Sequence, residues 1–214
     1  MKKLSLILAA LATVTNGFAQ GTVFFYNNIT TVVTTRVYMP TPGNDSIQKY
    51  GNTATDTPPG TQTYVGALVD GNGFTAQIWS APGANQPESS LVGQTTTTFR
   101  TGAAAGIFAD AITATLSNVL PDAPVATLQI RVFATQYGSW AAANAASQIF
   151  PYGQPLGASL LFNVDNIGGT INTPPNLVGL TSFSLFRVIP EPSSTAFGGL
   201  GAAAMLLRRK RAGR

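Results

Sequence analysis

The 214-residue sequence contains no cysteine and no histidine, and only 9% of its residues carry a charge. Without cysteine, neither a disulfide nor thiolate chemistry is possible. An exported form of this chain must therefore be held together by packing alone. Without histidine, the commonest general base and the commonest metal ligand are both missing. These absences remove the usual starting points for an enzyme active site.

The net charge of +4 belongs to the two ends of the chain. Lys2 and Lys3 lie at the start, and five basic residues lie in the last seven positions. The other five basic residues stand against eight acidic ones, so the region between the ends has a net charge near −3. The sequence pI of about 9.6 therefore does not indicate nucleic-acid binding, and we expect no nucleic-acid partner.

The first 19 residues have the three-part layout of a secretory signal peptide. A basic start precedes an apolar run over residues 4–14, and Gly17 and Ala19 then occupy the −3 and −1 positions of a cleavage site before Gln20. The alternatives are a buried N-terminal helix and a membrane anchor. The apolar run is shorter than the roughly 20 residues that a transmembrane helix needs. We therefore expect cleavage between Ala19 and Gln20.

The last 26 residues combine three features in a fixed order. Pro190, Glu191 and Pro192 form a rigid, turn-like tripeptide, and residues 195–207 carry no charge. As a helix, that uncharged run would measure about 20 Å, less than a hydrocarbon core of about 30 Å. A basic cluster follows and favours a cytoplasmic end; its members are Arg208, Arg209, Lys210 and Arg211. A marginal anchor behind a rigid motif indicates a segment that is processed.

The ending "VIPEPSSTAFGGLGAAAMLLRRKRAGR" resembles the PEP-CTERM sorting signal of Gram-negative bacteria. Residues 190–192 match its motif, residues 196–207 its short transmembrane helix and residues 208–211 its basic finish. Ile189 before the motif departs slightly from the frequent Val-Pro-Glu-Pro form. Body segments such as "TTTTFRTGAAAGIF" are similar to a Verrucomicrobia-like group of PEP-CTERM proteins, which brings no activity to named residues.

The resemblance implies recognition by an exosortase, an integral-membrane enzyme of the cysteine-protease type. It also implies cleavage near the motif, followed by release or attachment at the cell surface. Proteins with this signal are often associated with exopolysaccharide or biofilm matrix. We therefore divide the chain into a signal peptide (1–19), an extracytoplasmic domain (20–188) and a sorting signal (189–214).

The domain over residues 20–188 is predicted to be all-β. Abundant glycine, proline and threonine favour short strands and turns. In the clearest strand, "VATLQIRVFAT", Leu128, Ile130 and Val132 alternate with Gln129 and Arg131. Roughly eight or nine strands predict a single β-sandwich or jelly roll. In the precursor, an N-terminal signal helix and a C-terminal transmembrane helix flank this domain.

Local patterns predict several elements within the domain. Residues 21–27 and 29–38 are rich in β-branched and aromatic residues and are predicted to be strands. Two apolar runs around Asp70-Gly71-Asn72-Gly73 predict a hairpin. Residues 44–62 are predicted to be a long polar loop, and the alanines of residues 139–150 favour one or two helical turns.

The sequence contains no recognisable catalytic constellation. There is no Gly-x-Ser-x-Gly motif, Lys49 has no serine partner by motif, and acids such as Glu88 are isolated. Asp70 and Asn72 carry oxygens that suit Ca²⁺, but the remaining acidic ligands of a calcium loop are missing. The same holds at Asp165, so both segments are predicted to be polar turns. We expect no enzymatic activity, no metal and no cofactor.

Four aromatic residues, Trp79, Tyr137, Trp140 and Tyr152, are candidates for stacking on sugar rings. Large aromatics are more often buried, so we expect these to lie in the core or at its edge. The threonine run over residues 95–98 fits either an O-glycosylated stretch or an edge strand with a hydroxyl face.

The sequence thus predicts an exported, non-enzymatic protein of the cell surface or extracellular matrix. Its precursor is anchored in the membrane by the C-terminal helix, and its partners are exosortase and exopolysaccharide. One alternative is a carbohydrate-binding module, which requires exposed aromatics in line on one sheet face. The other is a carbohydrate-active enzyme, which requires two carboxylates about 5–10 Å apart in a cleft.

Overall fold

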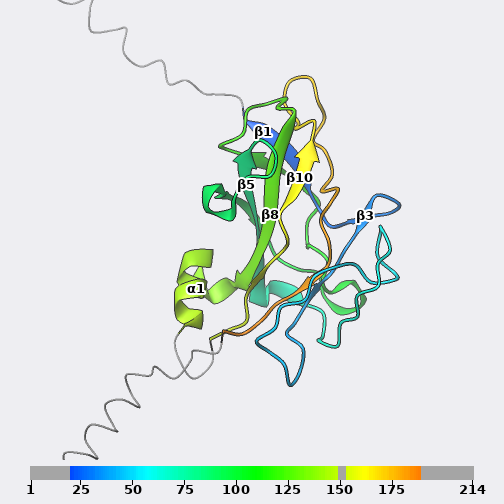
Figure 1. Cartoon of the computed structure of the whole chain (residues 1–214), viewed down its shortest axis with the longest axis vertical. Coiled ribbons are helices and arrows are strands. Elements are labelled where there is room, and N and C mark those ends of the chain that lie inside the picture. The colour runs from blue at the N-terminus through cyan, green and yellow to red at the C-terminus, as the bar shows by residue number, and fades with distance from the viewer. Residues whose placement is uncertain (1–19, 149–152, 189–214) are drawn as a thin grey trace, which may run out of the picture.

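The computed structural model describes residues 20–148 and 153–188 (Figure 1). Ala19, Tyr152, the Pro-Glu-Pro motif at 190–192 and the basic cluster at 208–211 lie outside the described residues. The described part is mostly β-structure, arranged in several sheets, as the sequence predicted. None of the helices in this part is long and apolar enough to cross a membrane.

A five-stranded antiparallel sheet forms the centre of the domain (Figure 1). The strand order is β10-β8-β5-β6, and β9 also pairs with β8. The longest ladder joins β5 to β8 over nine residue pairs, from Phe74 opposite Ala134 to Pro82 opposite Ala126. The strands are β5 (Phe74–Pro82), β6 (Val92–Thr97), β8 (Val125–Ala134), β9 (Gly157–Ala158) and β10 (Phe162–Asp165).

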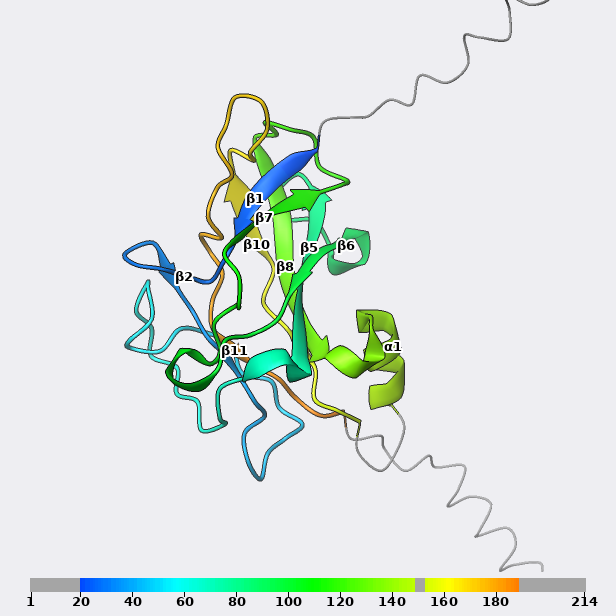
Figure 2. The same ribbon diagram turned by 180° about the vertical axis from the view of Figure 1, so that it is seen from behind.

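A second layer is formed by the antiparallel pair β1 (Gly21–Phe25) and β7 (Ile112–Leu116). Figure 2 shows this pair in front of β8 and β5. The main hydrophobic core draws on both layers. Its fully buried members include Val23, Phe25, Ala114 and Leu116 from the pair, and Ala76, Ile78, Leu128, Ile130 and Val132 from the central sheet. The predicted alternation in β8 is therefore confirmed on its apolar face.

The described residues contain eleven strands, more than the eight or nine that we expected, because several are very short. The predicted strand over residues 29–38 is broken into three pieces. Thr31 adopts a positive φ of 66°, which turns the chain between the first two pieces. The two-residue strands other than β9 are β2 (Asn28–Ile29), β3 (Val33–Thr34), β4 (Val37–Tyr38) and β11 (Phe183–Ser184); β2 pairs with β3, and β11 runs parallel to β4.

The hairpin predicted around residues 70–73 is wrong. Gly71–Gly73 form a 3₁₀ turn, η1, and the preceding segment pairs elsewhere. The Val69 N–H donates to the Val37 carbonyl (3.0 Å), and the Val69 carbonyl accepts from the Gly106 N–H (2.7 Å). Strand β5 instead pairs with β8 and β6. Residues 71–73 do form a turn, but the segments on either side of it pair with distant parts of the chain and not with each other.

The helical and loop predictions are confirmed. Helix α1 (Trp140–Ser147) begins after Ser139, whose hydroxyl oxygen accepts from the Ala142 N–H at 3.2 Å. Residues 44–62 contain no regular strand or helix, and the threonine run falls in β6, at the edge of the central sheet. The remaining 3₁₀ turns of the described residues are η2 (Glu88–Ser90), η3 (Gly102–Ala104) and η4 (Thr135–Tyr137).

Asn27 is a fully buried amide that connects three separate segments. Its Nδ2 donates to the carbonyls of Thr35 (2.9 Å) and Gly106 (3.1 Å), and its Oδ1 accepts from the Phe108 N–H (2.9 Å). Gly106 and Phe108 lie 79 and 81 residues away in the sequence. The amide therefore cross-links distant backbone segments inside the core.

We predict that Asn27→Leu lowers the free energy of unfolding by about 3 kcal/mol or more, because three buried backbone groups lose partners that are worth about 1–3 kcal/mol each. Urea denaturation of the purified protein measures this loss. The matched control is Asn144→Leu on the exposed side of α1, which should change stability by less than about 0.5 kcal/mol. Equal urea midpoints for Asn27→Leu and the wild type would contradict the proposed role of the amide.

The carboxylate of Asp122 holds the loop that follows β10. Its Oδ2 accepts from the N–H (2.9 Å) and hydroxyl (2.7 Å) of Thr170, and its Oδ1 accepts from the N–H groups of Ile171 (3.0 Å) and Asn172 (2.7 Å). These bonds, that of the Asn172 N–H first, lower the pKa of Asp122 from its ordinary 3.8 to about 2. The charged form of the carboxylate is therefore stabilised by folding.

Because the pKa of Asp122 is lowered in the folded state, its contribution to stability is complete above pH 3.8 and is lost as the pH falls towards about 2. We expect Asp122→Asn to have a lower urea midpoint than the wild type at pH 7 and a weaker fall in midpoint over that acidic range. Asp110→Asn serves as the control, since that exposed carboxylate has no hydrogen-bond partner in the described residues. Identical acid profiles for Asp122→Asn and the wild type would refute this account.

Candidate functional site

The polar residues singled out in the sequence are dispersed over the described structure. Lys49 donates from Nζ to the carbonyl of Thr63 at 3.2 Å, and Asp70 is exposed before η1. Asp165 is exposed at the end of β10. Within residues 20–148 and 153–188, no three His, Cys, Asp or Glu side chains are grouped closely enough to hold a metal ion.

Two of the candidate aromatics, Trp79 and Trp140, are brought together by Arg131. The guanidinium carbon lies 3.8 Å from the ring centroid of Trp79 and 5.3 Å from that of Trp140. The Nε of Arg131 donates to Gln129 Oε1 (2.8 Å), and its Nη2 donates to Glu88 Oε1 (3.1 Å). Strand β8, strand β5, α1 and η2 thus each contribute to one cluster on the outer face of the central sheet.

The environment of this arginine cluster favours a structural role. Arg131 is only 7% exposed, and burial lowers its pKa while the nearby Glu88 carboxylate opposes that change. Trp79 and Trp140 are half-buried, and the guanidinium occupies ring surface that a sugar would use. Tyr137 and Trp140 also pack against a small core cluster formed by Phe133, Ala143 and Leu156. As expected, Tyr137 and Trp140 lie at the edge of the core.

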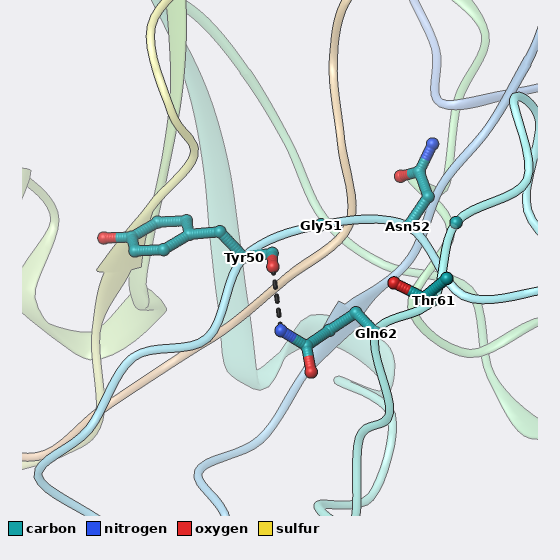
Figure 3. Close-up of a pocket in the computed structure, with 6 residues that line it drawn as sticks. Tyr50, Gly51, Asn52, Thr61 and Gln62 are labelled. Carbon is teal, nitrogen blue, oxygen red and sulfur yellow. Dashed lines mark hydrogen bonds between the residues drawn. The ribbon is translucent and has the colours of Figure 1, made fainter.

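The second candidate region is the irregular connection between β4 and η1, residues 39–70. Connections longer than about 12–15 residues without secondary structure are uncommon and are usually functional or disordered. This one is held by hydrogen bonds within it and to Ser182, and it borders two open hollows. The first has a volume of about 350 Å³ and is lined by Tyr50, Gly51, Asn52, Gly60, Thr61 and Gln62 (Figure 3).

The second hollow, of about 340 Å³, adjoins the first. Both are lined by Thr61 and Gln62, which therefore form a ridge between them. We call the two cavities the paired hollows. The second is lined by Thr53, Ala54, Thr55, Thr61, Gln62, Thr63 and Tyr64. None of the residues that line the paired hollows carries a charge.

A buried polar network holds Asn52, the buried residue that forms the floor of the first hollow. Asn52 Oδ1 accepts from the Ser182 N–H (2.9 Å), and Asn52 Nδ2 donates to the Pro58 carbonyl (2.7 Å). Asp56 Oδ2 accepts from the Ser182 hydroxyl (2.8 Å) and from the Thr53 N–H (2.7 Å). Ser182 comes from the segment just before β11, so a distant part of the chain fixes the loop.

Tyr64 adds an aromatic wall to the second hollow. Its hydroxyl lies 2.7 Å from the Gly51 carbonyl and 2.8 Å from the Ser182 carbonyl. Its ring stacks on that of Tyr38, with centroids 4.0 Å apart and planes 3° from parallel. Burial raises the pKa of Tyr64, and the Coulombic effects of Tyr38 and Asp56 raise it further. Tyr64 is therefore neutral at physiological pH.

The rim of the first hollow is held by Gln62. Its Nε2 donates to the Tyr50 carbonyl at 3.0 Å, the contact marked in Figure 3, and its backbone N–H donates to the Asn52 carbonyl at 2.9 Å. The Tyr50 ring points away from Asn52 and Thr61, so Tyr50 contributes mainly its backbone. Gly60 is required here, because a Cβ atom would lie only 2.2 Å from the Asn52 carbonyl oxygen. The paired hollows thus offer hydroxyl, amide and peptide groups in fixed positions.

Sequence reasoning identified this segment as a loop but not as a site. The available signals were its length, the absence of charge over residues 57–64 and the Gly60 that follows two prolines. The chain matches no family model, no curated protein and no solved structure. The interpretation of the paired hollows therefore depends on their own geometry.

The arginine cluster is predicted to stabilise the outer face of the sheet. Arg131→Ala should lower the free energy of unfolding by about 2–3 kcal/mol, through the loss of a desolvated cation–π contact and of packed side-chain stem. The chain has only two tryptophans, so its tryptophan fluorescence reports on this cluster alone. We expect a red-shifted emission maximum in the folded variant, together with a lower urea midpoint.

Arg100→Ala provides the control for Arg131→Ala, because Arg100 is exposed and lies over Tyr26 instead of a tryptophan. Its emission maximum should be that of the wild type. An unchanged emission maximum in Arg131→Ala would show that the guanidinium does not shield the indoles.

Proposed function

We propose that this chain is an exported, non-enzymatic protein of the cell surface or extracellular matrix, sorted by exosortase through its Pro-Glu-Pro motif. The proposal combines the N-terminal signal pattern, cleaved between Ala19 and Gln20, with the C-terminal pattern of motif, apolar run and basic cluster. Its precursor is held in the membrane by the C-terminal segment. Its β-domain, which we interpret as a β-sandwich of two layers, is the part that is displayed.

The fit between the fold and the two signals carries this proposal. Within the part of the chain that the structure describes, hydrogen-bonded structure begins at Gly21, whose N–H donates to the Val119 carbonyl (2.8 Å). In the described residues it extends to Arg187, whose N–H donates to the Asp45 carbonyl (2.7 Å). Gly21 lies just after the predicted signal cleavage, and Arg187 lies three positions before Pro190. Processing at both predicted sites would therefore leave these two hydrogen bonds intact.

The placement of the two ends also supports display. Strand β1 begins at one end of the long axis, whereas the last described residues reach the opposite end (Figure 1). The salt bridge between Arg187 Nε and Asp45 Oδ2 (3.5 Å) and the bond from Arg187 Nη1 to the Gly153 carbonyl (3.1 Å) hold that last segment against the domain. In a membrane-anchored precursor the Arg187 end would face the membrane, and the β1 end would face outward.

The test is the intact mass of the protein recovered from the envelope and medium of an exosortase-containing host. We expect the wild type to lack residues 1–19 and the region beyond about residue 192. The triple variant Pro190→Ala, Glu191→Ala, Pro192→Ala should keep the basic C-terminus and accumulate in the membrane. Pro42→Ala, in an exposed loop of the domain, is the control and should be processed normally. A wild-type mass that retains residues 208–214 would refute the sorting proposal.

A further inference from the structure

We propose that the paired hollows of residues 50–64 bind a neutral glycan. This inference rests on the proposed function, because an exported domain meets glycans outside the cell. It adds a binding site, and a neutral ligand, to the exopolysaccharide association that the resemblance implies. The carrying observation is a pair of adjoining open hollows whose lining combines hydroxyl, amide and peptide groups with the apolar surface of Tyr64, Ala54 and the threonine methyls, a mixture that matches the hydroxyls and C–H faces of a sugar.

Thr61 occupies the centre of the proposed site. It is exposed, it lines both hollows, and neither its N–H nor its hydroxyl has a hydrogen-bond partner within the described part of the chain. The Thr63 hydroxyl is likewise unpartnered there, at the second hollow. A hydroxyl both donates and accepts, so it complements the hydroxyls of a sugar in either direction. The unpartnered groups of Thr61 and Thr63 are therefore available to a chain of sugars that extends from one hollow to the other.

The size and rigidity of the cavities fit a sugar-sized ligand. Volumes of about 350 and 340 Å³ lie at the lower end of the ~300–1,000 Å³ range of small-molecule sites. The Ser182 network and the Gln62 bonds fix the floor and rim before any ligand arrives. A pre-organised loop loses little entropy on binding, which favours affinity for a weakly interacting polar ligand.

The charges around the paired hollows favour a neutral ligand over an anionic one. Lys49, on the chain next to Tyr50, has its Nζ engaged by the Thr63 carbonyl at 3.2 Å. The buried carboxylate of Asp56 lines neither hollow, but it accepts from the N–H of Thr53, a residue of the second hollow, at 2.7 Å. A nucleic acid needs several cations for its phosphates. A peptide needs a free strand edge or apolar pockets. The lining residues supply no cation and no described strand edge, and their apolar surface is interrupted by hydroxyl and amide groups.

The tryptophan cluster and this site share no residue, although the Tyr50 ring, which points away from Asn52 and Thr61, lies near enough to Glu88 for that carboxylate to add to the rise in the Tyr50 pKa that burial causes. Both views show α1 on one side of the central sheet and the connection containing residues 50–64 on the other (Figures 1 and 2). Binding in the paired hollows should therefore leave the emission of Trp79 and Trp140 unchanged. A glycan that instead used those indoles would alter it. Fluorescence thus distinguishes the two surfaces in one titration.

The experiment is affinity electrophoresis of the full chain in a detergent without a sugar headgroup. The gels contain dextran, galactomannan or a soluble β-glucan as neutral probes, or alginate as the acidic probe. We expect at least one neutral polysaccharide to retard the wild type. Thr61→Lys places a long charged side chain on the shared ridge and should raise the dissociation constant about tenfold or more. Thr113→Lys, at an exposed threonine of β7, is the matched control and should bind as the wild type.

The double variant Thr61→Ala, Thr63→Ala removes the free hydroxyls without adding bulk and should also weaken retardation. It keeps the test valid if Thr61→Lys has a lowered urea midpoint. The inference is overturned if none of the neutral gels retards the wild type, if only alginate does, or if both threonine variants bind normally. Loss of binding with normal processing refutes this inference alone, whereas binding with an unprocessed C-terminus refutes only the sorting proposal.

Discussion

The hydrogen bonds of Ser182 are the interaction on which the long connection between β4 and β5 depends. The hydroxyl donates to Asp56 and accepts from the Arg36 N–H at 2.8 Å, while the Ser182 N–H donates to Asn52. These partners lie 126, 146 and 130 positions away in the sequence. The chain has no cysteine and therefore no disulfide. The hydrogen bonds of this one small buried residue instead fix an irregular loop to a distant segment.

This arrangement links the proposed site to the end of the domain. The segment that supplies Ser182 continues through β11, which runs parallel to β4, and reaches Arg187 with its contacts to Asp45 and Gly153. Cleavage anywhere before Arg187 would remove part of the floor of the paired hollows or its support. A processing point at residues 190–192 keeps all of these contacts. These contacts are therefore compatible with the proposed cleavage near the motif, as with any cleavage after Arg187.

Local patterns predicted those elements whose stability is decided locally. The alternation in β8 placed Leu128, Ile130 and Val132 in the core, and the alanines after Ser139 formed α1. The hairpin at residues 70–73 failed because Val69 found a partner in Val37, more than thirty positions earlier. The paired hollows could not be predicted for the same reason, since their floor depends on Ser182. Pairing between distant segments leaves no periodic signal in the sequence.

Most of the few charged side chains of the domain bond to other parts of the protein. This limits the kinds of ligand that the domain can bind. All five basic residues between positions 20 and 188 have a protein partner: Arg36 (Ala105 carbonyl), Lys49 (Thr63 carbonyl), Arg100 (Ala109 carbonyl), Arg131 (Glu88) and Arg187 (Asp45). The same region holds seven acidic residues. Because the acids outnumber the bases and two of the five cations are paired with carboxylates, the domain attracts a polyanion only weakly. A neutral ligand does not depend on such attraction, because its hydroxyls can pair with threonine, amide and peptide groups that the fold has already put in place.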